Sequence, residues 1–99
     1  MPPAHRQTIE KLTKEMVVSN SSGLHARPTS ELVRCAMRFK SAITIEANGR
    51  TCSGTSIMDI MTADIRAGAK ILVTAEGPDA KKALDALELC LAGLEKKGL

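Results

Sequence analysis

The chain is nearly free of aromatic residues. Its 99 residues include one Phe and no Trp or Tyr, so the core must be built from aliphatic side chains. The same shortage removes the aromatic platforms on which unpaired bases stack. Basic residues are scattered, the net charge is only +3, and no run of them forms the stripe typical of a nucleic-acid surface. We therefore expect no nucleic-acid partner.

Long hydrophobic runs are absent as well. No apolar stretch approaches the length that crosses a bilayer, and the N-terminus lacks the hydrophobic block of a signal peptide. Hydrophobic residues make up 43% and charged residues 25% of the chain, as in ordinary globular domains. These proportions and the short length predict one domain, without membrane insertion, in the cytoplasm.

The cysteines are too few and too widely spaced for a disulfide framework. Cys35, Cys52 and Cys90 are odd in number, and neither a CxxC pair nor any metal-ligand spacing is present. We expect free, mostly buried thiols that act as small apolar side chains in a reducing compartment. No metal and no cofactor is expected.

Hydrophobic periodicity predicts the order strand, helix, strand, strand, helix, strand, helix. The strands are predicted at residues 14–19, 41–47, 50–53 and 70–76, and the helices at 26–39, 56–64 and 80–96. Asn48-Gly49 is a hairpin turn signal between the second and third strands. One sheet with helices on one face buries three amphipathic stripes most simply, so we expect an α+β fold. Residues 1–13 are interpreted as an N-terminal extension to a domain at 14–99.

Two of the predicted helices have recognisable starts. Ser56-Ile57-Met58-Asp59 matches a capping box, in which the serine hydroxyl and the carboxylate bind backbone N–H groups reciprocally. Gly77-Pro78-Asp79 turns the chain and is expected to cap the last helix. Along that helix the leucines at 84, 87, 91 and 94 form one apolar stripe.

The stretch Gly23-Leu24-His25-Ala26-Arg27-Pro28 places a histidine between a glycine turn and a helix start. A helix start offers unpaired N–H groups and partial positive charge, which favour an anion. An imidazole there can carry a phosphoryl group, and Arg27 can pair with it. A histidine that only caps the helix is the structural alternative.

The element order and this hexapeptide resemble the HPr family, the small histidine-containing phosphocarriers of the bacterial phosphoenolpyruvate-dependent phosphotransferase system. The resemblance extends over residues 14–94. Two further segments carry it: Ser56-Ile57-Met58 followed by Met61 and Gly68, and Ala75-Glu76-Gly77 ahead of an Ala- and Leu-rich last helix. Three segments in the family's order and spacing are much harder to obtain by chance than one.

The resemblance implies an open-faced β-sandwich, with a four-stranded antiparallel sheet and three helices on one face. It implies that His25 accepts a phosphoryl group on Nδ1 from enzyme I, whose own group comes from phosphoenolpyruvate, and passes it to EIIA proteins. The chain is then a carrier that is consumed and regenerated, and not an enzyme. A monomer is expected.

The residue chemistry of the motif agrees with that role. Imidazole is a largely neutral nucleophile near cytosolic pH. The backbone N–H groups of Ala26 and Arg27 can donate to phosphoryl oxygens, and the Arg27 guanidinium can offset their charge. Pro28 has no N–H and fixes the backbone. Gly23 is expected to provide a backbone shape or a close approach that a side chain would block.

The resemblance also implies a docking surface beside His25. It would include Ile57, Met58 and Met61 on the second helix, with Arg34 available for acidic partners. Helical spacing alone also allows the first three to be core residues and Arg34 to be a solvated charge. Flexible methionines are adapted to surfaces that meet several partners.

Ser56 aligns with the serine that a dedicated kinase modifies in many family members, which adds an HPr serine kinase/phosphorylase to the candidate partners. The alternative function is therefore a regulatory binding module controlled through Ser56, with histidine transfer secondary. Helix capping explains the same serine fully. Asp59 replaces the usual glycine, and its carboxylate would repel a phosphate on Ser56. Thr29 replaces the usual alanine, and little effect is expected from it.

Overall fold

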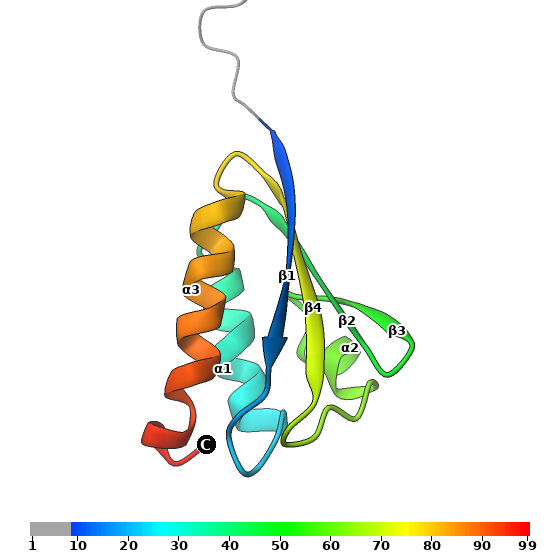
Figure 1. Cartoon of the computed structure of the whole chain (residues 1–99), viewed down its shortest axis with the longest axis vertical. Coiled ribbons are helices and arrows are strands. Elements are labelled where there is room, and N and C mark those ends of the chain that lie inside the picture. Colours follow the sequence, from blue (N-terminus) through cyan, green and yellow to red (C-terminus); the bar gives the residue numbers. More distant parts are fainter. Residues whose placement is uncertain (1–8) are drawn as a thin grey trace, which may run out of the picture.

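The computed structural model describes residues 9–99 as one antiparallel sheet covered on one face by helices (Figure 1). The strands lie in the order β1-β4-β2-β3, with bounds β1 (Glu10–Val17), β2 (Ala42–Ala47), β3 (Arg50–Ser53) and β4 (Lys70–Gly77). The helices are α1 (Ala26–Ala36), α2 (Ile57–Met61) and α3 (Ala80–Gly93), followed by a 3-10 turn, η1 (Glu95–Lys97). This confirms the predicted element order and the open-faced sandwich.

Alternation along the strands separates a covered face from an open one. Ile43 and Ile45 of β2 and Val73 of β4 are at most 4% exposed and pack beneath the helices. On the open face, Thr13 of β1 pairs in register with Thr74 of β4, and their hydroxyl oxygens lie 2.8 Å apart. Because side chains alternate along a strand, this register decides which residues enter the core.

The core is aliphatic, as the composition predicts. The leucines at 84, 87, 91 and 94 are each at most 5% exposed, which confirms the predicted stripe on the last helix. Phe39, the single aromatic residue, is only partly buried against this core. α1 and α3 lie side by side over the sheet (Figure 1), so their apolar stripes and the covered face of the sheet form one continuous cluster.

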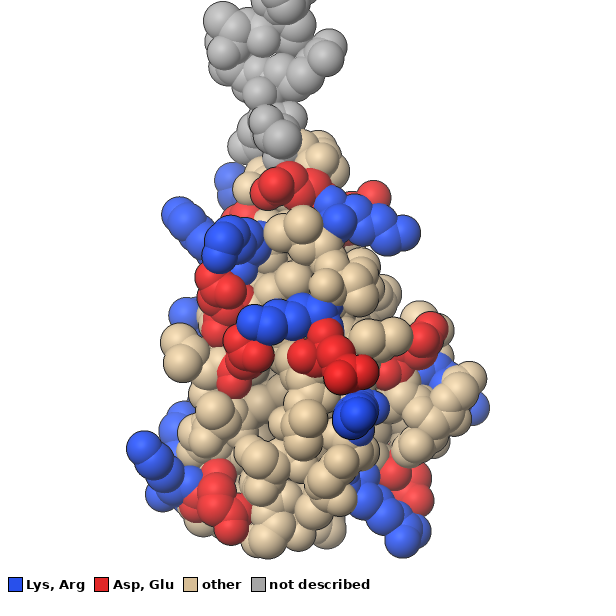
Figure 2. All heavy atoms as spheres, viewed as in Figure 1, with Lys and Arg blue, Asp and Glu red and all other residues tan. Residues whose placement is uncertain are grey.

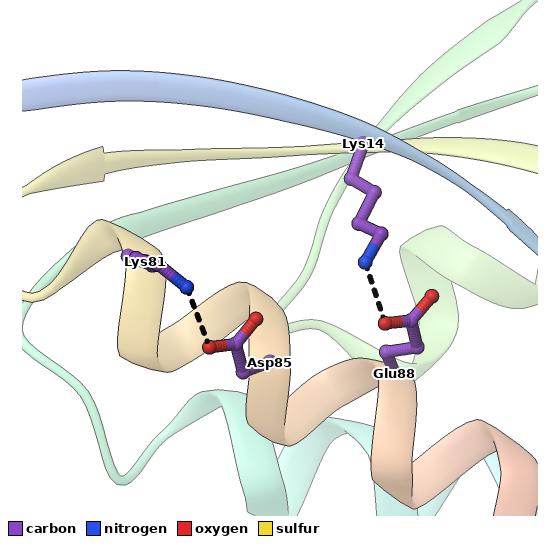
Figure 3. Close-up of polar contacts among 4 residues, drawn as sticks. All are labelled: Lys14, Lys81, Asp85 and Glu88. Carbon is purple, nitrogen blue, oxygen red and sulfur yellow. Dashed lines mark hydrogen bonds and ion pairs between the residues drawn. The ribbon is translucent and has the colours of Figure 1, made fainter.

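Charged side chains of both signs are interspersed over the face drawn in Figure 2. Lys14 of β1 reaches Glu88 of α3 at 2.6 Å, and Lys81 contacts Asp85 at 3.1 Å along α3 (Figure 3). All four side chains are substantially exposed, so each pair contributes little stability. No helix among residues 9–99 is long and apolar enough to cross a membrane.

The element ends differ from the prediction. β1 begins at Glu10, earlier than the predicted start at residue 14, and residues 1–8 of the predicted extension lie outside the described part. The three predicted helices each end short, at Ala36, Met61 and Gly93. After each helix, the backbone forms 3-10-type hydrogen bonds from residue i to residue i−3, as from Phe39 N–H to the Ala36 carbonyl. Hydrophobic periodicity does not distinguish such turns from helix.

Asp79 occupies the N-cap position of α3, in agreement with the predicted cap, but its side chain makes no capping hydrogen bond. Its carboxylate instead accepts hydrogen bonds from the Ser41 hydroxyl at 2.6 Å and from the N–H groups of Ser41 and Lys40, both at 2.9 Å. These bonds, the Ser41 hydroxyl foremost, lower the pKa of the Asp79 carboxyl. The carboxylate therefore ties the start of α3 to the segment before β2.

Candidate functional site

His25 occupies the N-cap position of α1 with an exposed side chain. Its backbone is extended, and its carbonyl accepts the first helical bond from Thr29 N–H at 2.9 Å. Its imidazole makes no capping hydrogen bond, so His25 caps α1 through its backbone alone. The ring is left available to solvent at the helix start.

The first N–H groups of α1 remain free for a ligand. Ala26 and Arg27 are its first two residues, and within residues 9–99 neither backbone N–H has an acceptor. No acidic residue lies in the first turn, so nothing there offsets the positive end of the helix dipole. Pro28 lies in the same turn, where its missing N–H costs no helical bond.

The loop before His25 is held against the segment between α2 and β4. Gly23 has φ of +69°, and a Cβ there would lie 2.9 Å from both Arg66 Cα and the Ile65 carbonyl oxygen. Leu24 N–H donates to that same carbonyl at 2.9 Å. Both expected roles of this glycine, a special backbone shape and a close approach, are therefore confirmed.

Two buried polar residues that sequence reasoning missed complete this loop. Asn20 and Thr29 are each 0% exposed. The Asn20 amide donates to the Gly23 carbonyl at 2.9 Å, and the Thr29 hydroxyl donates to the Leu24 carbonyl at 3.0 Å. Thr29, which was expected to matter little, therefore joins α1 to the loop that carries His25. In the sequence, Asn20 and Thr29 are recognisable only as polar residues, and polarity does not indicate that they are buried.

Two open depressions meet at His25. One of about 450 Å³ includes Met61 and Arg66 on its walls, and the other of about 270 Å³ includes Arg27. Of the predicted residues, His25 therefore shares one depression with Met61 and the other with Arg27. Arg66 is a second cation near the imidazole that sequence reasoning missed, and its guanidinium is 3.0 Å from the Asp64 carboxylate.

Helix α2 presents its methionines to solvent. Met58 is 77% and Met61 41% exposed, whereas Ile60 is fully buried and anchors the helix. Ile57 is half-buried against the core. The core alternative is therefore wrong for both methionines, because Ile60 already supplies the buried side of this short helix.

One of the two hydrogen bonds of the predicted capping box at α2 is confirmed. The Ser56 hydroxyl accepts from Asp59 N–H at 3.1 Å. The reciprocal bond is absent among the described residues, because the Asp59 carboxylate accepts from Ser53 N–H at 2.7 Å instead. Asp59 therefore ties α2 to the end of β3, and Ser56 is engaged at the helix start.

Arg34 lies away from His25. It follows Arg27 by seven residues, or about 10 Å along the helix axis. Its side chain is 75% exposed, and its guanidinium is 3.3 Å from the Glu31 carboxylate. Among residues 9–99, no group of three or more His, Cys, Asp or Glu side chains could hold a metal ion.

An open-faced sandwich with an exposed histidine at the start of its first helix defines the class of protein. The family model described as PTS HPr component phosphorylation site matches residues 12–92, so the chain belongs to the HPr family. That match contains the whole loop, α1, the short α2 and most of α3.

Known relatives agree. The phosphocarrier protein HPr of Borreliella burgdorferi is 41% identical over 66 residues, which are 67% of this chain and 77% of that protein. The multiphosphoryl transfer protein of Salmonella typhimurium is 37% identical over 88% of this chain, but only 24% of that longer protein is matched. The crystal structure of HPr from Bacillus anthracis superposes with a TM-score of 0.78 at 42% identity, covering 81% of this chain and 95% of that one.

Proposed function

We propose that this chain is a phosphocarrier of the phosphotransferase system that carries its phosphoryl group on His25. The observation that carries the proposal is an exposed imidazole that makes no capping hydrogen bond and lies beside two free N–H groups at the start of α1. The family membership supports the same role. The phosphorylated donor is enzyme I, supplied from phosphoenolpyruvate, and the acceptors are EIIA proteins of sugar uptake or of a regulatory branch.

The transfer step uses the neutral imidazole as nucleophile. Nδ1 of His25 attacks the phosphorus, a new N–P bond forms, and the bond to the donor's histidine breaks. The N–H groups of Ala26 and Arg27 donate to the phosphoryl oxygens, and the Arg27 guanidinium balances their charge. In the transfer to EIIA, a histidine of EIIA is the nucleophile that attacks the phosphorus, and the N–P bond to His25 breaks.

The open position of His25 supports a carrier better than an enzyme. The imidazole is exposed and lies between open depressions, so a partner can bring its own histidine directly onto the phosphoryl group. A phosphoryl group held at an exposed helix start is stabilised without being enclosed. It can therefore be released again, as a relay requires.

The docking surface is proposed to be the exposed side of α2 beside His25. It comprises Ile57, Met58 and Met61, with Arg34 on α1 meeting acidic groups at the margin. The large exposed fractions of the two methionines support this role, since apolar exposure beside a site marks a partner surface. We propose that the chain acts as a monomer in the cytoplasm.

The proposal is tested by phosphorylation with enzyme I and phosphoenolpyruvate. The wild-type chain and the control His5→Ala should take up acid-labile, base-stable phosphate and pass it to an EIIA protein. His25→Ala should take up none. Uptake by His25→Ala would refute the assignment. An acid-stable phosphate on Ser56 that changes partner binding, with no transfer from His25, would instead support the regulatory alternative and its serine kinase/phosphorylase.

A further inference from the structure

Two cysteines that are distant in sequence meet between α1 and α3. Cys35 lies near the end of α1 and Cys90 near the end of α3, and, in addition to burial, the Cys35 thiol is close enough to raise the pKa of the Cys90 thiol. Both line one cavity of about 510 Å³ between the two helices. We propose that this pair is a modification site: a dithiol that reacts with an anionic small-molecule disulfide, such as oxidised glutathione, and closes into a disulfide joining α1 to α3.

The two thiols differ in access, which orders the reaction. Cys35 is 7% exposed, whereas Cys90 is only half-buried. A reagent that enters the cavity therefore meets the Cys90 sulfur first. Cys35 lines the same cavity and is proposed to resolve the product.

The cavity carries an excess of positive charge. Arg34, Arg38 and Lys97 line it against a single carboxylate, that of Glu31. The carboxylate is shared, at 3.3 Å from Arg34 and 3.0 Å from Lys97, and the residues that α3 contributes beside Cys90 are uncharged. An excess of cations attracts carboxylate-bearing reagents and raises their local concentration.

The reaction is a two-step thiol–disulfide exchange. The Cys90 thiolate attacks one sulfur of oxidised glutathione, forms a mixed disulfide and expels one glutathione thiolate. The Cys35 thiolate then attacks the Cys90 sulfur and expels the second glutathione. The two protein thiols are oxidised to one disulfide, and one glutathione disulfide is reduced to two thiols. A disulfide needs its sulfurs about 2.05 Å apart, so the two side chains must come together as the bond forms.

The rate should depend steeply on pH. Burial raises the pKa of the Cys35 thiol, and burial together with Cys35 raises the pKa of Cys90 to about 11. The thiolate is the reactive form, so the rate should rise about tenfold per pH unit between pH 7 and 9. Glu31, whose carboxyl pKa is lowered chiefly by Lys97, stays ionised across that range, and the arginines and lysine keep their charge.

The test compares two reagents on the folded, reduced full chain. Oxidised glutathione and the cationic disulfide cystamine are supplied at equal concentration at pH 8, and the products are mapped by peptide mass. We expect a Cys35–Cys90 disulfide, formed faster with oxidised glutathione. Raising the salt concentration, or the substitution Arg38→Gln, should bring the two rates closer together.

Cysteine variants separate the dithiol from general thiol reactivity. Cys52 is 1% exposed in β3, and Cys52→Ser should react like wild type. Cys35→Ser should stop at a mixed disulfide on Cys90, and Cys90→Ser should lose the reaction. The proposal is overturned if the Cys35–Cys90 bond forms only in denaturant, if cystamine reacts as fast as glutathione, or if Cys52 reacts equally. None of these measurements depends on phosphoryl transfer.

Discussion

At the scale of single residues, the position of His25 depends on neighbours that carry no chemistry of their own. Gly23 allows the loop to approach the backbone of residues 65–67. Asn20 and Thr29 then use buried hydrogen bonds to fix the carbonyls of that loop. The imidazole is exposed and makes no side-chain capping bond, so its place is set by its backbone.

Gly23→Ala should destabilise the protein more than Gly49→Ala. Both glycines have φ near +70°, at +69° and +76°, so both substitutions carry the left-handed strain of about 1 kcal/mol. Only at Gly23 does the added Cβ meet backbone atoms at 2.9 Å, while Gly49 has nothing within 4 Å. Urea unfolding of both variants measures the difference, and equal losses would contradict the close-approach argument.

At the scale of elements, single carboxylates join segments that the sequence separates. Asp79 ties the start of α3 to the segment before β2, and Asp59 ties α2 to β3. Each does so by accepting backbone N–H groups that would otherwise need another partner. These ties fix how the elements meet, whereas periodicity fixes only which faces are apolar.

Asp79→Asn should lower Tm at neutral pH, because the ionised carboxylate accepts three hydrogen bonds. The folded-state pKa of Asp79 is lowered, so its stabilisation is full above the ordinary carboxyl pKa and is lost as pH falls through the lowered value. The Tm difference between wild type and variant should therefore shrink in acid. Asp85→Asn, on the exposed side of α3, should change Tm little at any pH. A constant difference for Asp79→Asn would show that ionisation is irrelevant.

Met58→Lys should weaken docking on α2 without weakening the fold. Met58 is 77% exposed, so replacing it disturbs little packing in the free chain. In the complex with a partner, the variant offers less apolar contact area and an added charge. We expect kcat/KM for phosphorylation by enzyme I to fall about tenfold or more, with Tm nearly unchanged. Met37→Lys is the matched control, since Met37 is 67% exposed at the far end of α1. A similar fall in kcat/KM for both variants would contradict the proposal that α2 carries the docking surface.

At the scale of the whole molecule, one aliphatic core unites the sheet with α1 and α3. Its largest fully buried side chains come from both layers, among them Leu32, Ile45, Ile71 and Leu87. Exposed ion pairs such as Lys14–Glu88 add little to this (Figure 3). The stability of the domain is therefore expected to depend on packing between the layers.

Leu87→Ala and Leu89→Ala test that dependence within one helix. Leu87 is 1% exposed and Leu89 is 75% exposed. Truncating the buried leucine should cost about 2–5 kcal/mol, through lost transfer energy and a residual cavity. Truncating the exposed leucine should change the unfolding free energy by about 0.5 kcal/mol or less. Denaturant unfolding distinguishes the two, and similar costs would mean that α3 is packed differently.

Much of the fold could be predicted because its signals are local. The alternation of Ile43 and Ile45 marked a half-buried strand, and Asn48-Gly49 marked the hairpin. The helix ends were predicted less well, because the turns after Ala36 and Met61 continue the apolar pattern while changing the bonding. The N-cap role of Asp79 was predicted without its side-chain partners, since Ser41 lies far away in the sequence.

The sequence by itself determined the element order, the aliphatic core and a histidine at a helix start, because periodicity, caps and turn residues act over a few positions. Only the tertiary structure decided which distant groups come together: Arg66 lines a depression with His25, Asp79 accepts a hydrogen bond from Ser41, and Cys35 lines a cavity with Cys90. These contacts depend on how helices pack on the sheet, and no local pattern encodes that geometry.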